Sequence, residues 1–210
     1  GFKLEPMLNT ARKVTGVDVL HKAAASSGLA HSYTGEGVVV GMMDTGLDPM
    51  HLNFHDADGN LRIKRVWDIK GATGAVTMHD TPEAIANYQT DSRVDTHASH
   101  VLGIMGGSHD AKPGSGNGSV ALVNSRGKLS TGNNANPYYG VAKDAELSVC
   151  VGTLENNNVA IAAGLFSDYV EQTGKPGVMN LSLGHQHGPH DGTDASALAL
   201  AAAGKKVLIC

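Results

Sequence analysis

An aspartate and a pair of histidines have the chemistry for proton transfer and lie where a fold can use them. Asp44 directly follows Gly37 to Met43 (GVVVGMM), an apolar, valine-rich run that predicts a strand buried on both faces of a parallel sheet. Ligands bind at the carboxyl ends of strands in such sheets, and a carboxylate withdrawn from water there needs a partner. A second interpretation stays open at this point: Asp44 starts an Asp-Thr-Gly turn and bonds only to its own backbone.

His97 and His100 stand three residues apart in a His-Ala-Ser-His sequence, so they share one face of a helix expected over His97 to Gly106. Asp95 and Thr96 precede this helix and can cap its first turn. An imidazole in that turn can reach a neighbouring strand end, where it would suit general acid and base catalysis. The two rings could also pack or be solvated without a role, or bind a metal ion as a pair.

Two classes of hydrolase use residues of these types. A metal-dependent hydrolase could draw ligands from Asp44, His97, His100 and His109, but the sequence contains no HExxH motif or comparable ligand frame. Aspartic peptidases also use an Asp-Thr-Gly turn. They need two such turns in an all-β fold, whereas this sequence has one turn among alternating helices and strands.

Helical and strand-like segments alternate along the chain, which predicts an α/β fold of three layers with a mostly parallel sheet. Residues 1–36 are expected to form a helical lead-in, with two short helices between Glu5 and Ser27. A hairpin near a sheet edge is expected over Asn60 to Asp68, after the Asp58-Gly59 turn. The remaining expected elements are a long surface loop (Ser108 to Pro137), strands (Ala145 to Val151, Val178 to Leu183, Lys206 to Cys210) and helices (Asn158 to Thr173, Asp194 to Ala203).

The composition is that of an ordinary globular protein, with 41% hydrophobic residues, 17% charged residues and a net charge of -4. This charge does not favour nucleic acid or an anionic membrane, and no apolar run reaches the roughly 18 residues of a membrane-spanning helix. The first residues lack a basic segment followed by an apolar stretch, so no signal peptide is expected within the sequence. Cys150 and Cys210 lie in apolar, strand-like runs, which predicts two buried free thiols.

Four stretches taken together resemble the subtilisin-like serine peptidases, or subtilases: GVVVGMMDTGLDPMHLNF (37–54), DTHASHVLGIMGG (95–107), YYGVAKDAELSVCVG (138–152) and VMNLSLG (178–184). The first two are similar to the aspartate and histidine motifs of the family and follow its order. The resemblance implies a subtilisin-like peptidase domain over 37–210, in which Asp44 and His97 are two members of an Asp-His-Ser triad. It also implies a substrate-binding role for part of the fourth stretch, namely Asn180, Ser182, Leu183 and Gly184.

Three shorter segments, ARKVTGVD (11–18), HLNF (51–54) and GPHDGT (188–193), are similar to secreted or cell-surface subtilases of anaerobic gut bacteria. This likeness implies a bacterial protein that works outside the cell on peptide or protein substrates. The triad needs no cofactor, but some subtilases bind calcium, so calcium stays open. Asp56 to Asn60 starts like a calcium-binding loop, yet Leu61 and Trp67 occupy its sixth and twelfth positions, which favours a hairpin turn.

The sequence departs from the family pattern in three places. The histidine motif, usually HGTH, reads HASH here, so Ala98 adds a methyl group that could crowd a substrate or be accommodated. The 53 residues from Asp44 to His97 imply an insertion around residues 60–90. No GTSMA-like serine motif occurs, and the sequence stops at the strand that leads, in the family, to an asparagine of the oxyanion hole.

We therefore expect a serine endopeptidase whose serine and oxyanion asparagine come from a C-terminal segment of the same peptidase. On that hypothesis this chain is a subtilisin-like fold truncated before its C-terminal strands, and it is inactive alone. The alternative from a different class is a pseudopeptidase that binds peptides without cutting them. The presence of both Asp44 and His97 argues against it, because a chain freed from catalysis has no chemical need for the pair.

Overall fold

The computed structural model describes residues 8–22, 28–56, 58–91, 95–108, 138–184, 189 and 191–210. The chain divides into two compact units, one built from 1–36, 50–62 and 102–145 and the other from 37–49, 63–101 and 146–210. The division of the sequence into a lead-in (1–36) and a peptidase domain (37–210) stays a prediction. None of the helices within the described ranges is long and apolar enough to cross a membrane.

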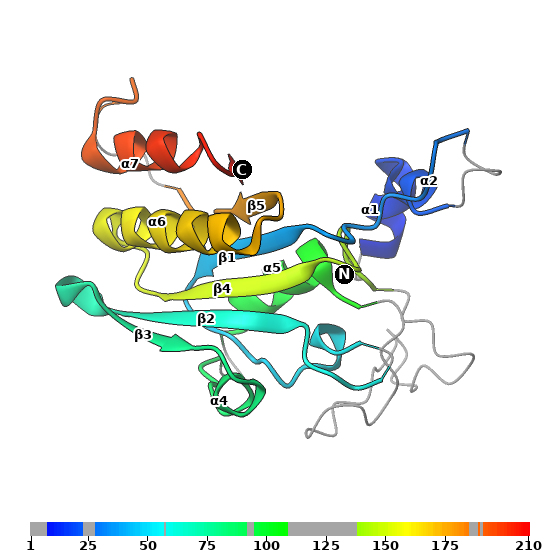
Figure 1. Cartoon of the computed structure of the whole chain (residues 1–210), viewed down its shortest axis with the longest axis horizontal. Helices are drawn as coiled ribbons and strands as arrows, with labels where there is room; N and C mark the ends of the chain where they lie inside the picture. The colour runs from blue at the N-terminus through cyan, green and yellow to red at the C-terminus, as the bar shows by residue number, and fades with distance from the viewer. Residues whose placement is uncertain are drawn as a thin grey trace, which may run out of the picture. The chain divides into compact units, whose positions relative to one another are not determined.

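The second unit contains a six-stranded sheet of order β3-β2-β4-β1-β5-β6 (Figure 1). All neighbouring strands run parallel except the pair β2 and β3. The strands are β1 (Val39–Asp44), β2 (Ile63–Lys70), β3 (Ala75–His79), β4 (Glu146–Gly152), β5 (Gly177–Asn180) and β6 (Leu208–Ile209). This mixed α/β sheet, mostly parallel, is the fold class that the alternating sequence pattern predicts.

The centre of the sheet is formed by β1 and β4, the two most apolar strands. Every residue of β1 is buried, and so are the five inner residues of β4. Continuous apolar runs of this kind are typical of parallel strands covered on both faces. Their register pairs Asp44 with Val151, so the carboxyl end of β1 lies beside the carboxyl end of β4.

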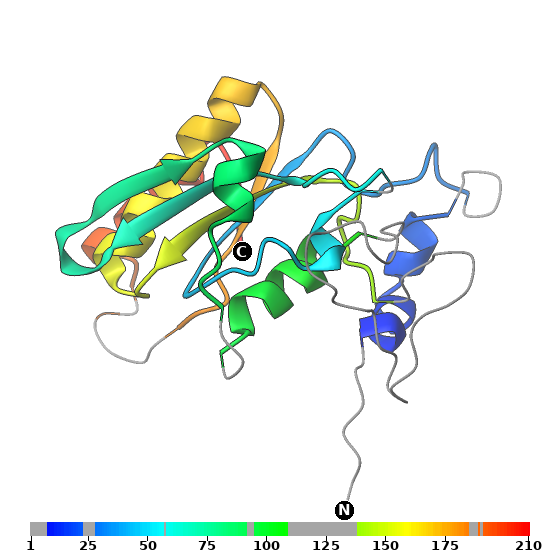
Figure 2. The same ribbon diagram turned by 90° about the horizontal axis from the view of Figure 1, so that it is seen from below.

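Helix α6 (Asn156–Thr173) packs on one face of this sheet through the apolar stripe that its spacing predicts. Val159, Ala162, Ala163, Phe166 and Val170 are buried in the core cluster. The helix ends at Gly174, whose left-handed φ of 65° suits glycine at a helix C-terminus. Figure 2 shows α6 and the start of α5 (His97–Gly106) on opposite sides of the sheet.

The hairpin was predicted in the wrong place. Strand β2 lies inside the sheet, between β4 and β3, and the hairpin joins β2 to the edge strand β3 through the short 3-10 helix η2 (Gly71–Thr73). The prediction missed β3 because four of its five side chains are exposed and show no apolar alternation. The residues that follow fold into α4 (Pro82–Ala86), so much of the insertion expected around 60–90 extends the second unit.

The Asp58-Gly59 turn itself is present, in the first unit. It closes an isolated antiparallel bridge between His55 and Leu61. The Asp56 carboxylate accepts hydrogen bonds from the backbone N–H groups of Asp58 and Asn60, at 2.9 and 2.8 Å. An aspartate that binds its own following backbone in this way forms a turn, as the sequence predicts for this segment.

Several elements are shorter than the sequence predicts. The N-terminal helices are α1 (Leu8–Val14) and α2 (Val17–Leu20), so the second ends well before Gly28. Strand β5 stops at Asn180 instead of Leu183, and α7 (Ala195–Ala203) starts after its capping residue Asp194. Most of the loop expected over Ser108 to Pro137 lies outside the described residues.

The two cysteines differ, contrary to the prediction that both are buried. Cys150 is buried in β4, and burial raises the pKa of its thiol. Cys210 is exposed, because it follows the short edge strand β6. The expectation of free thiols is correct for both residues, but that of burial holds only for Cys150.

Candidate active site

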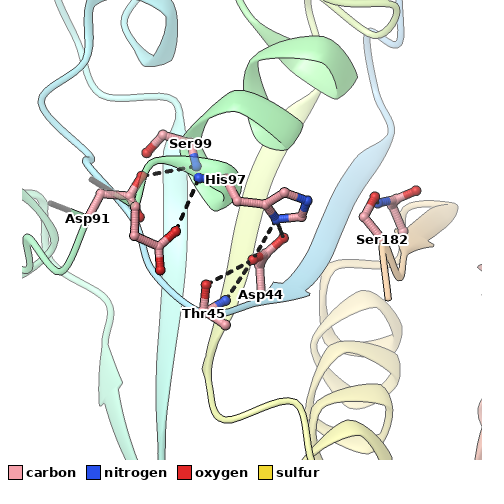
Figure 3. Close-up of polar contacts among 8 residues, drawn as sticks. Asp44, Thr45, Asp91, His97, Ser99 and Ser182 are labelled. Carbon is pink, nitrogen blue, oxygen red and sulfur yellow. Dashed lines mark hydrogen bonds and ion pairs between the residues drawn. The ribbon is translucent and has the colours of Figure 1, made fainter. Parts of the chain in front are cut away.

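Asp44 and His97, distant in sequence, form a hydrogen-bonded pair in the second unit (Figure 3). The Nδ1 atom of His97 lies 3.1 Å from Oδ1 and 3.0 Å from Oδ2 of Asp44. A carboxylate only accepts, so Nδ1 carries the proton that this bond uses. The other ring nitrogen, Nε2, is then free to exchange a proton with a reacting group.

The Asp44 carboxylate is buried and accepts hydrogen bonds from its own turn as well as from His97. The Asp44 side chain is only 2% exposed, because β1 ends inside the sheet. Oδ1 accepts hydrogen bonds from the backbone N–H of Thr45 at 2.7 Å and from the Thr45 hydroxyl at 3.3 Å. The two interpretations of Asp44 therefore hold together: it caps its own turn and also orients an imidazole.

His97 is the first residue of α5 and presents its ring at the start of the helix. Its side chain is 53% exposed, so solvent or a substrate can reach the ring. Its backbone N–H points to Oδ1 of Asp95 at 3.5 Å, and the Thr96 carbonyl accepts from the His100 N–H at 3.0 Å. These contacts start the helix at the position that the sequence predicts.

The remaining residues considered around the histidine motif do not take part in the Asp44–His97 pair. His100 is exposed one turn further along α5. Among the described residues, no group of three or more His, Cys, Asp or Glu side chains could hold a metal ion, and His109 lies outside that part of the chain. Ala98 is completely buried, so the additional methyl group of HASH is accommodated in the interior and does not reach the exposed site.

The predicted substrate-binding residues follow directly from β5. Asn180 is the last residue of this strand, and its Nδ2 donates to the Ser182 hydroxyl at 2.7 Å. Met42 pairs with Asn180, and Asp44 and Ser182 each follow two residues further along the chain. Leu183 packs on the core, and Gly184 is exposed. The segment after β5 therefore lies at the carboxyl end of the strands, on the same side of the sheet's strand ends as the Asp44–His97 pair.

Sequence reasoning missed three residues beside the pair: Thr90, Asp91 and Ser99. The Thr90 hydroxyl accepts from the Leu47 N–H at 3.0 Å, and the Ser99 hydroxyl accepts from the Asp48 N–H at 2.8 Å. Oδ2 of Asp91 accepts from the Ser99 N–H at 3.2 Å. Ser99 lies inside the histidine motif, but nothing in the pattern distinguishes Thr90 or Asp91 from other polar loop residues.

Most of the chain matches one known protein family. The sequence profile described as "Subtilase family" matches residues 35–210. The chain belongs to the subtilase family. No curated protein sequence matches this subtilase.

Three solved structures of similar fold are compared with the chain. The CspB protease of Clostridium perfringens has a TM-score of 0.64 and 22% identity, over 92% of this chain and 39% of that one. Sphericase has a TM-score of 0.54 and 22% identity, over 92% of this chain and 50% of that one. The S41 psychrophilic protease has a TM-score of 0.51 and 23% identity, with the same two coverages. At these identities the likeness shows the fold, and this subtilase chain spans half or less of each solved relative.

The subtilase fold removes one of the rival interpretations of Asp44. Aspartic peptidases place their Asp-Thr-Gly turns in an all-β fold, whereas this Asp44 ends a parallel strand of an α/β sheet. A buried carboxylate bonded to Nδ1 of an exposed imidazole is an arrangement that can accept and return a proton through Nε2.

Proposed function

We propose that this subtilase chain supplies the general base and its orienting carboxylate to a serine endopeptidase. The observation that supports this most directly is the bond from His97 Nδ1 to the buried Asp44 carboxylate, with more than half of the histidine side chain exposed. The family membership of residues 35–210 supports the same class of reaction. Peptides or proteins are the substrates that this reaction requires.

Each group has one task in the proposed reaction. His97 Nε2 takes the proton of a serine hydroxyl while its oxygen attacks the peptide carbonyl carbon. Asp44 holds the ring in the Nδ1-protonated form and stabilises the imidazolium that results. The imidazolium then protonates the leaving amine as the C–N bond breaks, and water releases the acyl group by the same sequence of proton transfers.

In this proposal the serine and an oxyanion asparagine come from a polypeptide segment outside these 210 residues. The sequence contains no GTSMA-like serine motif, which supports an external nucleophile. Loss of a triad nucleophile lowers kcat on the order of 10⁶-fold, and one oxyanion donor contributes roughly 10²- to 10³-fold. The chain alone should therefore show no measurable peptide hydrolysis.

The segment Asn180 to Gly184 is proposed to bind the extended substrate. It begins at Asn180, the last residue of β5, and lies at the carboxyl end of the strands, as Asp44 does. Main-chain groups in such a position can pair with a peptide as an added strand. The likeness of residues 11–18, 51–54 and 188–193 to secreted and surface subtilases supports a bacterial protein that works outside the cell.

The test labels the natural protein, purified from its source, with a fluorophosphonate probe that reacts with activated serines. Native and denaturing mass spectrometry then show whether this chain is joined or bound to further polypeptide, and peptide mapping locates the label. We expect the label on a serine outside the 210 residues, together with peptide hydrolysis. Label on a serine of this chain, such as Ser182, would contradict the external nucleophile. Absence of both label and hydrolysis would contradict the enzyme and favour a peptide-binding pseudopeptidase.

Two recombinant variants of the active protein test the pair itself. His97→Ala removes the base and Asp44→Asn removes the carboxylate that fixes the tautomer. Each should lower kcat by roughly 10⁴-fold or more without unfolding the sheet. Lys13→Ala, an exposed change on α1, is the control and should keep wild-type activity. Wild-type kcat in His97→Ala would refute the proposed role.

A further inference from the structure

We propose that Asp91 is a positioning residue that holds the loop after Asp44 and the helix of His97 in the arrangement that the pair needs. The inference rests on the proposed function of the pair. Asp91 makes no hydrogen bond to either side chain in the structure, but its carboxylate lies between the two backbone segments that carry them (Figure 3). Each of these contacts lies within the second unit.

The first contact joins the Thr90-Asp91 segment to the loop that follows β1. The Leu47 carbonyl accepts hydrogen bonds from the N–H groups of Thr90 and Asp91, at 2.9 and 3.1 Å. In return, the Leu47 N–H donates to the Thr90 hydroxyl at 3.0 Å. Leu47 is fully buried, so water does not compete for these bonds. They hold the loop in place three residues after Asp44.

The second contact is a very close approach of Asp91 to Gly46. A Cβ atom built on Gly46 would lie 2.3 Å from Oδ1 of Asp91, closer than any side chain can come. A side chain at position 46 would therefore require the Asp91 carboxylate to shift. The carboxylate therefore packs closely against the backbone of that turn.

The third contact joins Asp91 to the first turn of α5. The Ser99 N–H, one of the helix-start donors without a partner inside the helix, donates to Oδ2 of Asp91 at 3.2 Å. A capping residue normally supplies this acceptor from within the chain next to the helix. Here the acceptor comes from a residue that also contacts Gly46, so one carboxylate links the His97 helix to the Asp44 turn.

The Ser99 side chain makes a further contact with the loop that follows Asp44. Its hydroxyl accepts a hydrogen bond from the Asp48 N–H at 2.8 Å. The loop from Gly46 to Asp48 is thus connected to the start of α5 by two routes, through Asp91 and through Ser99. A small shift of either segment would change the distance between His97 Nδ1 and Asp44, and misplacement on the order of 1 Å can lower a catalytic rate about 10²-fold.

The surroundings of Asp91 disfavour its charged form. Burial raises its pKa, the nearby carboxylates of Asp95 and Asp48 raise it further, and the bonds to Ser99 act in the opposite direction. Asparagine has the same shape and could accept from the Ser99 N–H without that cost. Asp91→Asn is therefore a conservative variant that should retain the contact, whereas Asp91→Ala removes it.

The test reads the tautomer of His97 by two-bond ¹H–¹⁵N NMR on the 210-residue chain, which needs no serine. In the wild type we expect Nδ1 protonated and Nε2 unprotonated at a pH where the ring is neutral. Asp91→Ala should shift the ring toward a mixture of tautomers while the amide signals of β1 and β4 stay in place. Asp91→Asn should retain the wild-type pattern, and Asp168→Ala, an exposed change on α6, is the matched control.

A folded Asp91→Ala variant with the wild-type tautomer would overturn the inference. If that variant does not fold, Asp91→Ser decides, since the shorter side chain withdraws the acceptor from the Ser99 N–H. An unchanged tautomer in a folded Asp91→Ser variant would also overturn the inference. A wild-type chain that lacks the Nδ1-protonated form would instead contradict the Asp44–His97 pair, so the two failures are distinct. In the active enzyme, Asp91→Ala should lower kcat about 10- to 100-fold with little change in KM.

Discussion

Arg62 shows how a single buried side chain can complete the end of a helix. In the first unit its guanidinium is 9% exposed and donates to the carbonyl groups of Gly106 and Ala145, each at 2.6 Å, and to the Ser108 hydroxyl at 2.8 Å. Gly106 is the last residue of α5, where carbonyl groups lack partners within the helix. Burial lowers the pKa of Arg62 to about 10, so the side chain is still charged at neutral pH, with Asp144 and Asp56 opposing the shift.

Replacing Arg62 with methionine should lower the free energy of unfolding by roughly 2–4 kcal/mol, because two buried carbonyl groups and a hydroxyl lose their donor. Urea unfolding followed by circular dichroism measures the difference. Lys13→Met, an exposed change in the same unit, is the control and should alter stability by less than about 0.5 kcal/mol. Equal stability of the two variants would show that the Arg62 hydrogen bonds contribute nothing net.

At the scale of elements, the packing of α6 on β1 depends on the absence of a side chain at Gly41. Gly41 lies in the middle of β1, between Ser148 of β4 and Met179 of β5. A Cβ atom there would lie 2.4 Å from the ring of Phe166, which is itself buried in the core. The helix can lie close to the sheet only because β1 has a glycine at this point.

Gly41→Ala should therefore destabilise the protein by about 1–3 kcal/mol, since neither the ring nor the strand can move freely. The matched control is Gly164→Ala, on the exposed face of α6, where a Cβ meets nothing within 4 Å. There alanine should stabilise the helix by up to about 1 kcal/mol. Thermal unfolding of the two variants should thus change in opposite directions, and a shift of both in the same direction would reject this account of the packing.

For the whole molecule, acid stability depends on carboxylates whose folded-state pKa differs from the ordinary value. Glu146, at the start of β4, accepts hydrogen bonds from the Tyr169 hydroxyl and from Lys175 Nζ. Burial raises the pKa of Glu146, but the bonds from Lys175 and Tyr169 outweigh it and leave the pKa below the ordinary 4.5. Its contribution to stability is then complete above pH 4.5 and is lost as the pH falls through the lower, folded-state value.

Glu146→Gln should lower the free energy of unfolding at pH 7 by on the order of 0.5–1 kcal/mol, because the site is partly solvated. The difference from wild type should shrink as the pH falls below 4.5, where the carboxylate becomes protonated. Urea unfolding at a series of pH values from 7 to about 3 measures both effects. Glu83→Gln, an exposed change on α4, controls for the loss of one negative charge. A difference that grows toward low pH would contradict the sign of this linkage.

The sequence alone predicted those helices and strands whose pattern of apolar and capping residues is visible within a short stretch of chain. Three elements fold close to their predicted bounds: the strand before Asp44, helix α6 and the start of α5. Each is marked by residues close together in the chain, namely a continuous apolar run, an apolar stripe and a capping segment. Asp44 and His97 could be singled out in the same way, from motifs whose residues lie next to one another in the chain.

Only the tertiary structure decided which distant segments meet. Strand order placed β2 inside the sheet and left β3 exposed at its edge, so β3 has no apolar alternation to predict it. The contacts of Asp91 with Gly46 and Ser99 join three separate segments, and those of Arg62 join a loop to the end of a helix. A hydrogen bond of this kind depends on where two backbones come together in space, and the sequence around either partner shows no sign of it.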